Sequence, residues 1–242
     1  MLEEYREFSE IQAPIRELSD AQAGELTEFQ EYDEGTRNLQ ETIRFSEGGY
    51  TSDGRFVAGQ VCEVNSEAAE FDPEIAELAD ELNSWIEQGE QMSCAVASQT
   101  MAVNQLENGY HSESELLDIG REEGWYDDGT CPEDVGKIAE HMGMDVEQSN
   151  HVKAGELTMA NDAEVKVLAN VDSTLLHYPE CYKRCQADHV VQVLRVESTP
   201  QGEVVIINDP GHPGGRGAVY PIEIFERAFT GDITTIRKGA DA

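Results

Sequence analysis

The sequence predicts an α+β protein, in which a group of helices packs on an antiparallel β-sheet. Two observations indicate this fold. Apolar residues recur at helical spacing between residues 94 and 143, whereas β-branched runs dominate from residue 165 to residue 237. A third concerns size: 242 residues with 39% hydrophobic content suffice for a substantial core. No run approaches the roughly 18 apolar residues of a membrane-spanning helix.

Residues 1–82 are predicted to form an acidic N-terminal extension or small subdomain. Residues 1–30 are typical of acidic helices with a weak apolar face. Glycine-containing turns between aromatic and valine residues predict a short hairpin near Tyr50–Val64, and residues 66–82 predict a lead-in helix. A prosegment, a partner-binding or targeting domain, and an extension packed on the core all stay open.

Residues 83–242 are predicted to form a second domain, organised around a helix that begins at Cys94. Its apolar residues follow helical spacing as far as Asn108. Ser93 is a predicted N-cap, which puts Cys94 in the first turn, where unpaired N–H groups favour a thiolate. The Cys94 N–H and the side chain of Gln88 could together bind an oxyanion. The alternative is a buried cysteine on a core helix.

Two more helices are expected before the sheet. Ser112-x-x-Glu115 is a capping-box pattern ahead of an apolar run. A further helix is predicted to begin near Thr130, with a proline in its first turn, and to stop at Gly143. The aromatics of the intervening loop, residues 124–129, could line a cleft or pack between the helices.

The predicted strands bring a histidine and a carboxylate together. A strand over Val165–Val171 is followed by a loop over residues 172–187. Strands starting at His189 and ending at Asn208 are joined by a short polar turn, which predicts a hairpin. His189 and Asp209 would then lie at the same end of the sheet, where a base and its orienting acid must meet.

The end of the chain completes the predicted sheet. A glycine-rich loop over residues 211–217 contains His212, which could be a substitute base. His189 is preferred, because the start of a strand holds a ring more firmly than a flexible loop does. A short helix over Tyr220–Phe229 and a strand over Ile233–Arg237 follow.

The order of Gln88, Cys94, His189 and Asp209 resembles that of the papain-like cysteine peptidases. With a Gln-to-Cys offset of six, the four residues in this order are specific, and Asp209 and Ala95 make the sequence more similar to the bacteriocin-processing, double-glycine-leader branch, a bacterial group, than to papain itself. The resemblance covers residues 83–238. In papain the third member of the catalytic triad is an asparagine, and a tryptophan follows the catalytic cysteine. This chain has Asp209 and Ala95 at those places.

The resemblance implies a papain-like fold, with the nucleophile on the helices and the base and acid on the sheet. It also implies a thiol peptidase that uses a Cys-His-Asp triad and a glutamine oxyanion hole, without cofactor or catalytic metal. Amidase, transpeptidase or deamidase chemistry would use the same four groups. A catalytically silent papain-like domain that binds a peptide or a basic partner is the alternative from another class.

The net charge of the chain limits the kinds of partner that it is expected to bind. A net charge of −34 repels nucleic acid and anionic membranes, and it attracts basic peptide or protein substrates. A solubilising surface adapted to high salt would explain the same charge. No secretory signal is visible, so a cytoplasmic location with reduced thiols is the default expectation, with export by another route left open.

The five cysteines leave one unpaired if the others pair. Cys94 would be the unpaired thiol. Cys181 and Cys185 are close enough in sequence to pair locally or to bind a metal, although His177 and His189 are the only nearby residues that could complete a metal site there.

Overall fold

The computed structural model describes residues 43–239, apart from residue 71 and residues 182–185. The described residues all belong to one compact unit, Leu39–Ala242. The helices predicted for residues 1–30 lie outside the described residues. The domain boundary predicted after residue 82 stays a prediction, although strands before it join the same sheet as strands after it.

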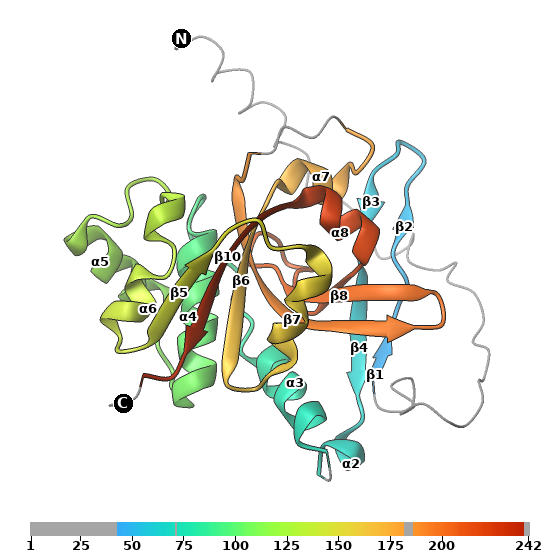
Figure 1. The fold of residues 1–242 in the computed structure, drawn as a ribbon, viewed down its shortest axis with the longest axis horizontal. Helices are drawn as coiled ribbons and strands as arrows, with labels where there is room; N and C mark the ends of the chain where they lie inside the picture. The colour runs from blue at the N-terminus through green and yellow to red at the C-terminus, as the bar shows by residue number, and fades with distance from the viewer. Residues whose placement is uncertain (1–42, 71, 182–185, 240–242) are drawn as a thin grey trace. The chain divides into compact units, whose positions relative to one another are not determined.

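A long antiparallel sheet forms the centre of the described unit (Figure 1). Its strand order is β1-β4-β9-β8-β7-β6-β10-β5, and each neighbouring pair is antiparallel. The strands are β1 (Ile43–Phe45), β4 (Gly59–Val64), β5 (Asp145–Ser149), β6 (Val165–Val171), β7 (His189–Thr199), β8 (Gly202–Asn208), β9 (Ala218–Pro221) and β10 (Phe229–Arg237). A separate hairpin pairs β2 (Gly49–Tyr50) with β3 (Phe56–Val57).

Helices cover both faces of this sheet. The α-helices are α2 (Ser66–Ala69), α3 (Pro73–Asn83), α4 (Cys94–Glu107), α5 (Glu113–Glu123), α6 (Lys137–His141), α7 (Ser173–His177) and α8 (Ile222–Ala228). Two 3₁₀ segments are η3 (Pro132–Asp134) and η4 (Ala154–Asn161). The described residues therefore form an α+β fold of helices packed on an antiparallel sheet, which confirms the predicted fold class.

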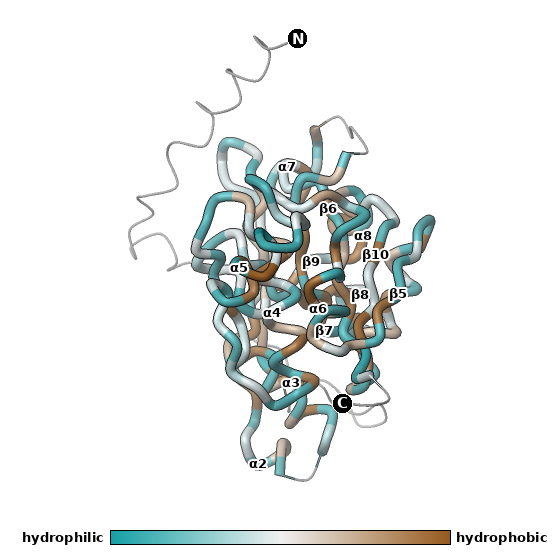
Figure 2. Tube along the Cα trace, turned by 90° about the vertical axis from the view of Figure 1, so that its left-hand side faces the viewer, coloured by the Kyte–Doolittle hydropathy of each residue, from teal (hydrophilic) through white to brown (hydrophobic). Residues whose placement is uncertain are grey.

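The alternation of side chains along the strands explains why helices pack on both faces of the sheet. In β7, Val190 packs with α4 and Leu194 with α3, whereas Val191 and Val193 join the cluster that contains α8 and η4. Strand β6 alternates in the same way. In Figure 2 strands β8 and β10 carry hydrophobic segments, whereas many outer loops are hydrophilic. Among the described residues, no helix has both the length and the apolarity needed to cross a bilayer.

Several predicted elements form as expected. Helix α4 ends at Asn108, which is in the left-handed conformation, and α5 has the full capping box between Ser112 and Glu115. Strand β6 has the predicted bounds, and the hairpin of β7 and β8 is present.

Other elements differ from the prediction. The helix expected up to Gly143 is split into η3 and α6, because Gly136 between them has φ +103°. A Cβ there would lie 2.6 Å from Val146 Cγ1, so the close approach of β5 requires glycine. The helix expected from Tyr220 begins only at Ile222, since Ala218–Pro221 pairs with β8 as β9. Strand β5 and helix α7 were not predicted.

The N-terminal elements also differ. Of the hairpin predicted over Tyr50–Val64, only β2 and β3 pair with each other, whereas β4 pairs with β1 and β9. The helix predicted over residues 66–82 is two helices, α2 and α3. Asp72 caps α3 through a hydrogen bond from the Glu74 N–H, and Pro73 follows as its first residue, so a new helix starts there.

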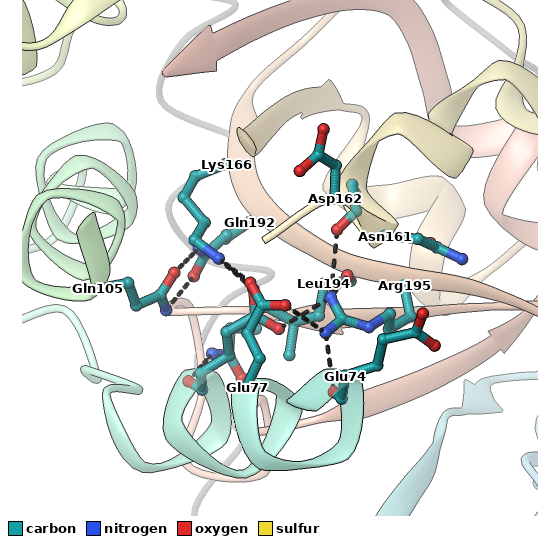
Figure 3. A network of polar contacts seen from close by, with 12 residues as sticks. Glu74, Glu77, Gln105, Asn161, Asp162, Lys166, Gln192, Leu194 and Arg195 are labelled. Carbon is teal, nitrogen blue, oxygen red and sulfur yellow. Dashed lines mark hydrogen bonds and ion pairs between the residues drawn. The ribbon is translucent and has the colours of Figure 1, made fainter. Parts of the chain in front are cut away.

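A buried cluster of charges fixes α3 to the sheet (Figure 3). Lys166 Nζ of β6 lies 2.6 Å from Glu77 and 2.7 Å from Glu81, both on α3. Arg195 of β7 reaches the same two carboxylates at 3.2 Å each. The C-terminal end of α3 then contacts the end of β8, because Asn208 Nδ2 donates to the Glu81 carbonyl at 2.8 Å.

Candidate active site

Cys94 is the first residue of α4, and its position is set by contacts between α4 and β7. The Ser98 hydroxyl donates to the Val190 carbonyl at 3.2 Å. Further along the helix, the side-chain amides of Gln105 and Gln192 pair across the same interface. These buried polar contacts fix the register of the helix against the strand, and they bring the first turn of α4 to the beginning of β7.

His189 and Asp209 meet at that end of the sheet, as predicted. His189 starts β7 and Asp209 follows β8, and the pairing of Gln192 with Asn208 sets them near each other. His189 Nε2 lies 2.6 Å from Asp209 Oδ1. The other ring nitrogen, Nδ1, is therefore the one left to interact with the Cys94 thiol, and the two groups shift each other's pKa.

The three groups shift one another's pKa values. Burial raises the pKa of the Cys94 thiol, but the hydrogen bond and charge of His189 outweigh burial and bring it below its usual range. Burial lowers the pKa of His189, yet the Asp209 carboxylate and then Cys94 raise it well above the usual range. Burial likewise raises the pKa of Asp209, but the charge of His189 outweighs burial and brings this pKa far below its usual range. These directions favour a thiolate–imidazolium pair.

The turn that carries Asp209 is held from several directions. The Gly211 N–H donates to Asp209 Oδ1 at 2.7 Å, and Trp85 Nε1 donates to the Asp209 carbonyl at 2.9 Å. A Cβ on Gly211 would lie 2.9 Å from His189 Cε1, so glycine lets the turn approach the ring. The carboxylate is thereby fixed against the imidazole.

Gln88 lies beside the same turn, because its backbone N–H donates to the Pro210 carbonyl at 2.9 Å. Its side-chain Nε2 donates to the Glu90 carbonyl at 2.9 Å, and its Oε1 is buried without a hydrogen-bond partner among the described residues. A buried amide with an unsatisfied atom is unusual in a protein interior, and a bound ligand would satisfy it. Only a rotation of the amide by half a turn, which gives up the hydrogen bond to the Glu90 carbonyl, would present its NH₂ group there.

His212 lies on the other side of Asp209. Its Nε2 is 3.8 Å from Asp209 Oδ2, and its Nδ1 accepts from the Gly214 N–H. The ring of His177 lies 5.8 Å from that of His212, and burial lowers the pKa of His177 to about 4. Of the two candidate bases, His189 lies nearer to the carboxylate, at 2.6 Å against 3.8 Å, and it is the one that lowers the pKa of the Cys94 thiol.

The segment before Cys94 departs from the prediction. Ser93 occupies the N-cap position, but its side chain makes no capping hydrogen bond. Its hydroxyl instead contacts Glu113 of α5, a residue that the sequence did not single out, because the two lie 20 positions apart. The aromatic loop is partly internal: Tyr126 is buried with α5 and α6, which favours the packing role that was left open.

Three further cysteines are described besides Cys94. Cys62, Cys131 and Cys181 are exposed, whereas Cys94 is only 8% exposed. Cys185 lies outside the described residues, so pairing with Cys181 stays a prediction. Among the residues that the structure describes, no three His, Cys, Asp or Glu side chains cluster as metal ligands.

Comparisons with known proteins give structural neighbours. No family model matches the chain, and no curated protein matches it. The peptidase domain of Streptococcus ComA, a bi-functional ABC transporter involved in a quorum sensing pathway, has 17% identity and a TM-score of 0.49, over 64% of this chain and 97% of that one.

Two further neighbours are peptidases. A double glycine motif protease from an AMS/PCAT transporter, solved with its leader peptide, has 21% identity and a TM-score of 0.46, over 64% of this chain and 90% of that one. The peptidase domain of Streptococcus mutans ComA has 16% identity and a TM-score of 0.40, over 63% of this chain and 98% of that one.

Proposed function

We propose that this protein is a papain-like thiol peptidase that hydrolyses peptide bonds through Cys94, His189 and Asp209. One observation carries the proposal: His189 Nε2 lies 2.6 Å from the Asp209 carboxylate, while its other ring nitrogen is left for the thiol of Cys94, whose pKa His189 lowers. This is the relation of nucleophile, base and orienting group that covalent acyl transfer needs.

The chemistry follows from these positions. The Cys94 thiolate attacks the carbonyl carbon of the substrate, and the negative charge on oxygen is held by the Cys94 N–H and the Gln88 amide. The His189 imidazolium protonates the leaving amine, and a thioester remains on Cys94. Neutral His189 then takes a proton from water, which attacks the thioester and releases the acid product. Asp209 keeps the ring oriented throughout.

The substrate class that we propose is a peptide or protein, with basic character favoured by the net charge of −34. The same groups would give a transpeptidase if an amine, rather than water, accepted the acyl group. They would give an amidase or deamidase if a side-chain amide entered instead.

A library of peptides with varied sequences tests the proposal. We expect the wild-type protein to cleave a subset of these peptides near neutral pH, detected as new termini by mass spectrometry. Cys94→Ala should abolish every new terminus, whereas Cys131→Ala, which removes an exposed thiol, should leave them unchanged. Cleavage that survives in Cys94→Ala would refute the assignment, and so would the absence of cleavage in all three proteins, which would favour a binding module.

A further inference from the structure

The segment between α3 and α4, residues 84–93, is attached to the rest of the unit on two sides. On one side it contacts the turn of the proposed acid, through the Trp85 indole and the Gln88 N–H. On the other side it contacts α5. The segment carries the proposed oxyanion donor Gln88 and ends directly before Cys94, so its conformation sets the distance between the two.

Glu113, the first residue of α5, makes the main contact on the second side. Its Oε2 accepts from the Gly89 N–H at 2.7 Å, and its Oε1 accepts from the Ser93 hydroxyl at 2.5 Å. Gly89 follows Gln88 and Ser93 precedes Cys94, so one carboxylate holds both ends of the intervening loop. Hydrogen bonds to an ionised acceptor are stronger than neutral ones, and Ser93 is fully buried.

The loop between these two contacts is strained. Met92 has φ +126°, a conformation that residues with a side chain rarely adopt. Such strain persists only where the surrounding contacts hold it in place, and it concentrates at functional sites. The neighbouring contact of Arg121 with Glu90 is also short, at 2.6 Å, but both side chains are nearly half exposed and solvent screens the pair.

We infer that Glu113 is a positioning residue for the oxyanion hole: by binding Gly89 and Ser93 it sets Gln88 relative to Cys94. The inference rests on the proposed function. It predicts that loss of Glu113 slows reactions in which Cys94 attacks a carbonyl, and leaves reactions that form no oxyanion unchanged. Glu113 has no contact with the thiol or with His189 among the interactions described, so the reactivity of the thiolate should not depend on it.

Two small reagents separate these reactions. With p-nitrophenyl acetate the Cys94 sulfur bonds to the acetyl carbon through an oxyanion, and p-nitrophenolate leaves. With iodoacetamide the sulfur displaces iodide directly and no oxyanion forms. In Glu113→Ala we expect acylation of Cys94 to slow by about tenfold or more, since loss of a whole oxyanion donor costs about 100-fold or more. Alkylation should stay within about twofold of the wild-type rate, with Cys94→Ala as the blank for both reagents.

Three variants serve as references. Glu115→Ala removes a carboxylate from the same helical turn, one that caps α5 and does not touch the loop, so it should lower the melting temperature without changing the ratio of the two rates. Gln88→Ala should lower the ratio of the acylation rate to the alkylation rate at least as much as Glu113→Ala does. Glu113→Gln, which keeps one acceptor oxygen, should restore part of the ratio that is lost in Glu113→Ala.

The outcomes are distinct. If Glu113→Ala leaves the ratio of acylation to alkylation unchanged, whether both rates stay the same or both fall equally, the positioning role is overturned and the triad is left intact. If Cys94 of the wild type reacts no faster than an exposed thiol with either reagent, the proposed function itself fails, and the role of Glu113 fails with it.

Discussion

At the scale of single residues, Asp209 differs from the asparagine that papain uses, and its contacts indicate what the charge adds. Oδ1 accepts hydrogen bonds from both His189 and Gly211. An asparagine could keep both through its own oxygen. The charge has a separate effect, since it raises the pKa of His189 and so keeps the imidazolium beside the thiol.

Asp209→Asn should therefore retain the fold and weaken the ion pair. Without the carboxylate the pKa of His189 falls, the imidazolium is lost at lower pH, and the pKa of the Cys94 thiol rises. Titration of the ultraviolet absorbance of the thiolate, with Cys94→Ala as the blank, should show a midpoint raised by about one pH unit or more. An unfolded variant, by circular dichroism, would mean that Asp209 is a structural turn residue instead.

The sequence predicted these residues because each carries a local signal. Cys94 begins an apolar helical pattern, His189 begins a β-branched run, and Asp209 follows another. Glu113 carried only the signal of an acidic residue in a first helical turn, which is common on any surface helix. Its contact with Ser93 depends on how α5 packs beside α4, and that packing is not encoded by either segment alone.

At the scale of elements, α3 connects the sheet to the turn that carries Asp209. Its C-terminal end binds Asn208, the residue before Asp209, and Arg216 Nε donates to the Leu82 carbonyl at 2.8 Å. The ion cluster of Lys166, Arg195 and the two glutamates holds the helix in that position (Figure 3). Sequence patterns predict the apolar face of α3, but its charged partners come from strands 85 or more residues later.

Lys166→Met should destabilise the protein by about 3–5 kcal/mol, because the buried carboxylate of Glu81 and the partly buried one of Glu77 would then share one guanidinium. Urea unfolding measures the change. Lys137→Met is the matched control, since Lys137 forms an exposed pair with Glu140 on α6, and its midpoint should stay near that of the wild type. Equal midpoints for both variants would show that the buried cluster does not hold α3 in place.

The split of the helix predicted up to Gly143 shows a limit of local patterns. Val135, Ile138 and Ala139 are all buried, as a continuous helix would require. The backbone nevertheless turns at Gly136, where Val146 and Thr234 from two strands leave no room for a side chain. Contacts between distant strands decide that break, so the segment could not predict it.

At the scale of the whole molecule, the charge is the dominant feature. The sequence has 50 acidic and 16 basic residues. Like charges at this density repel one another in the compact state, and salt screens the repulsion, since the Debye length falls from about 30 Å at about 0.01 M to about 3 Å at about 1 M salt.

The melting temperature should therefore rise steadily as NaCl increases from about 0.01 M to about 1 M. Sucrose at matched osmolality is the control, because it favours compact states without screening charge. A flat or falling melting temperature in NaCl would show that self-repulsion does not limit stability, and the adaptation to high salt would lose its support.

The proposed mechanism requires Cys94 to be an activated nucleophile despite its burial. Limiting iodoacetamide at about pH 6, followed by digestion and mass spectrometry, gives the alkylation rate of each cysteine in the same molecule. We predict that Cys94, only 8% exposed, reacts at least about tenfold faster than the exposed Cys62, Cys131 and Cys181. The claim would be contradicted if the exposed thiols reacted first and Cys94 last.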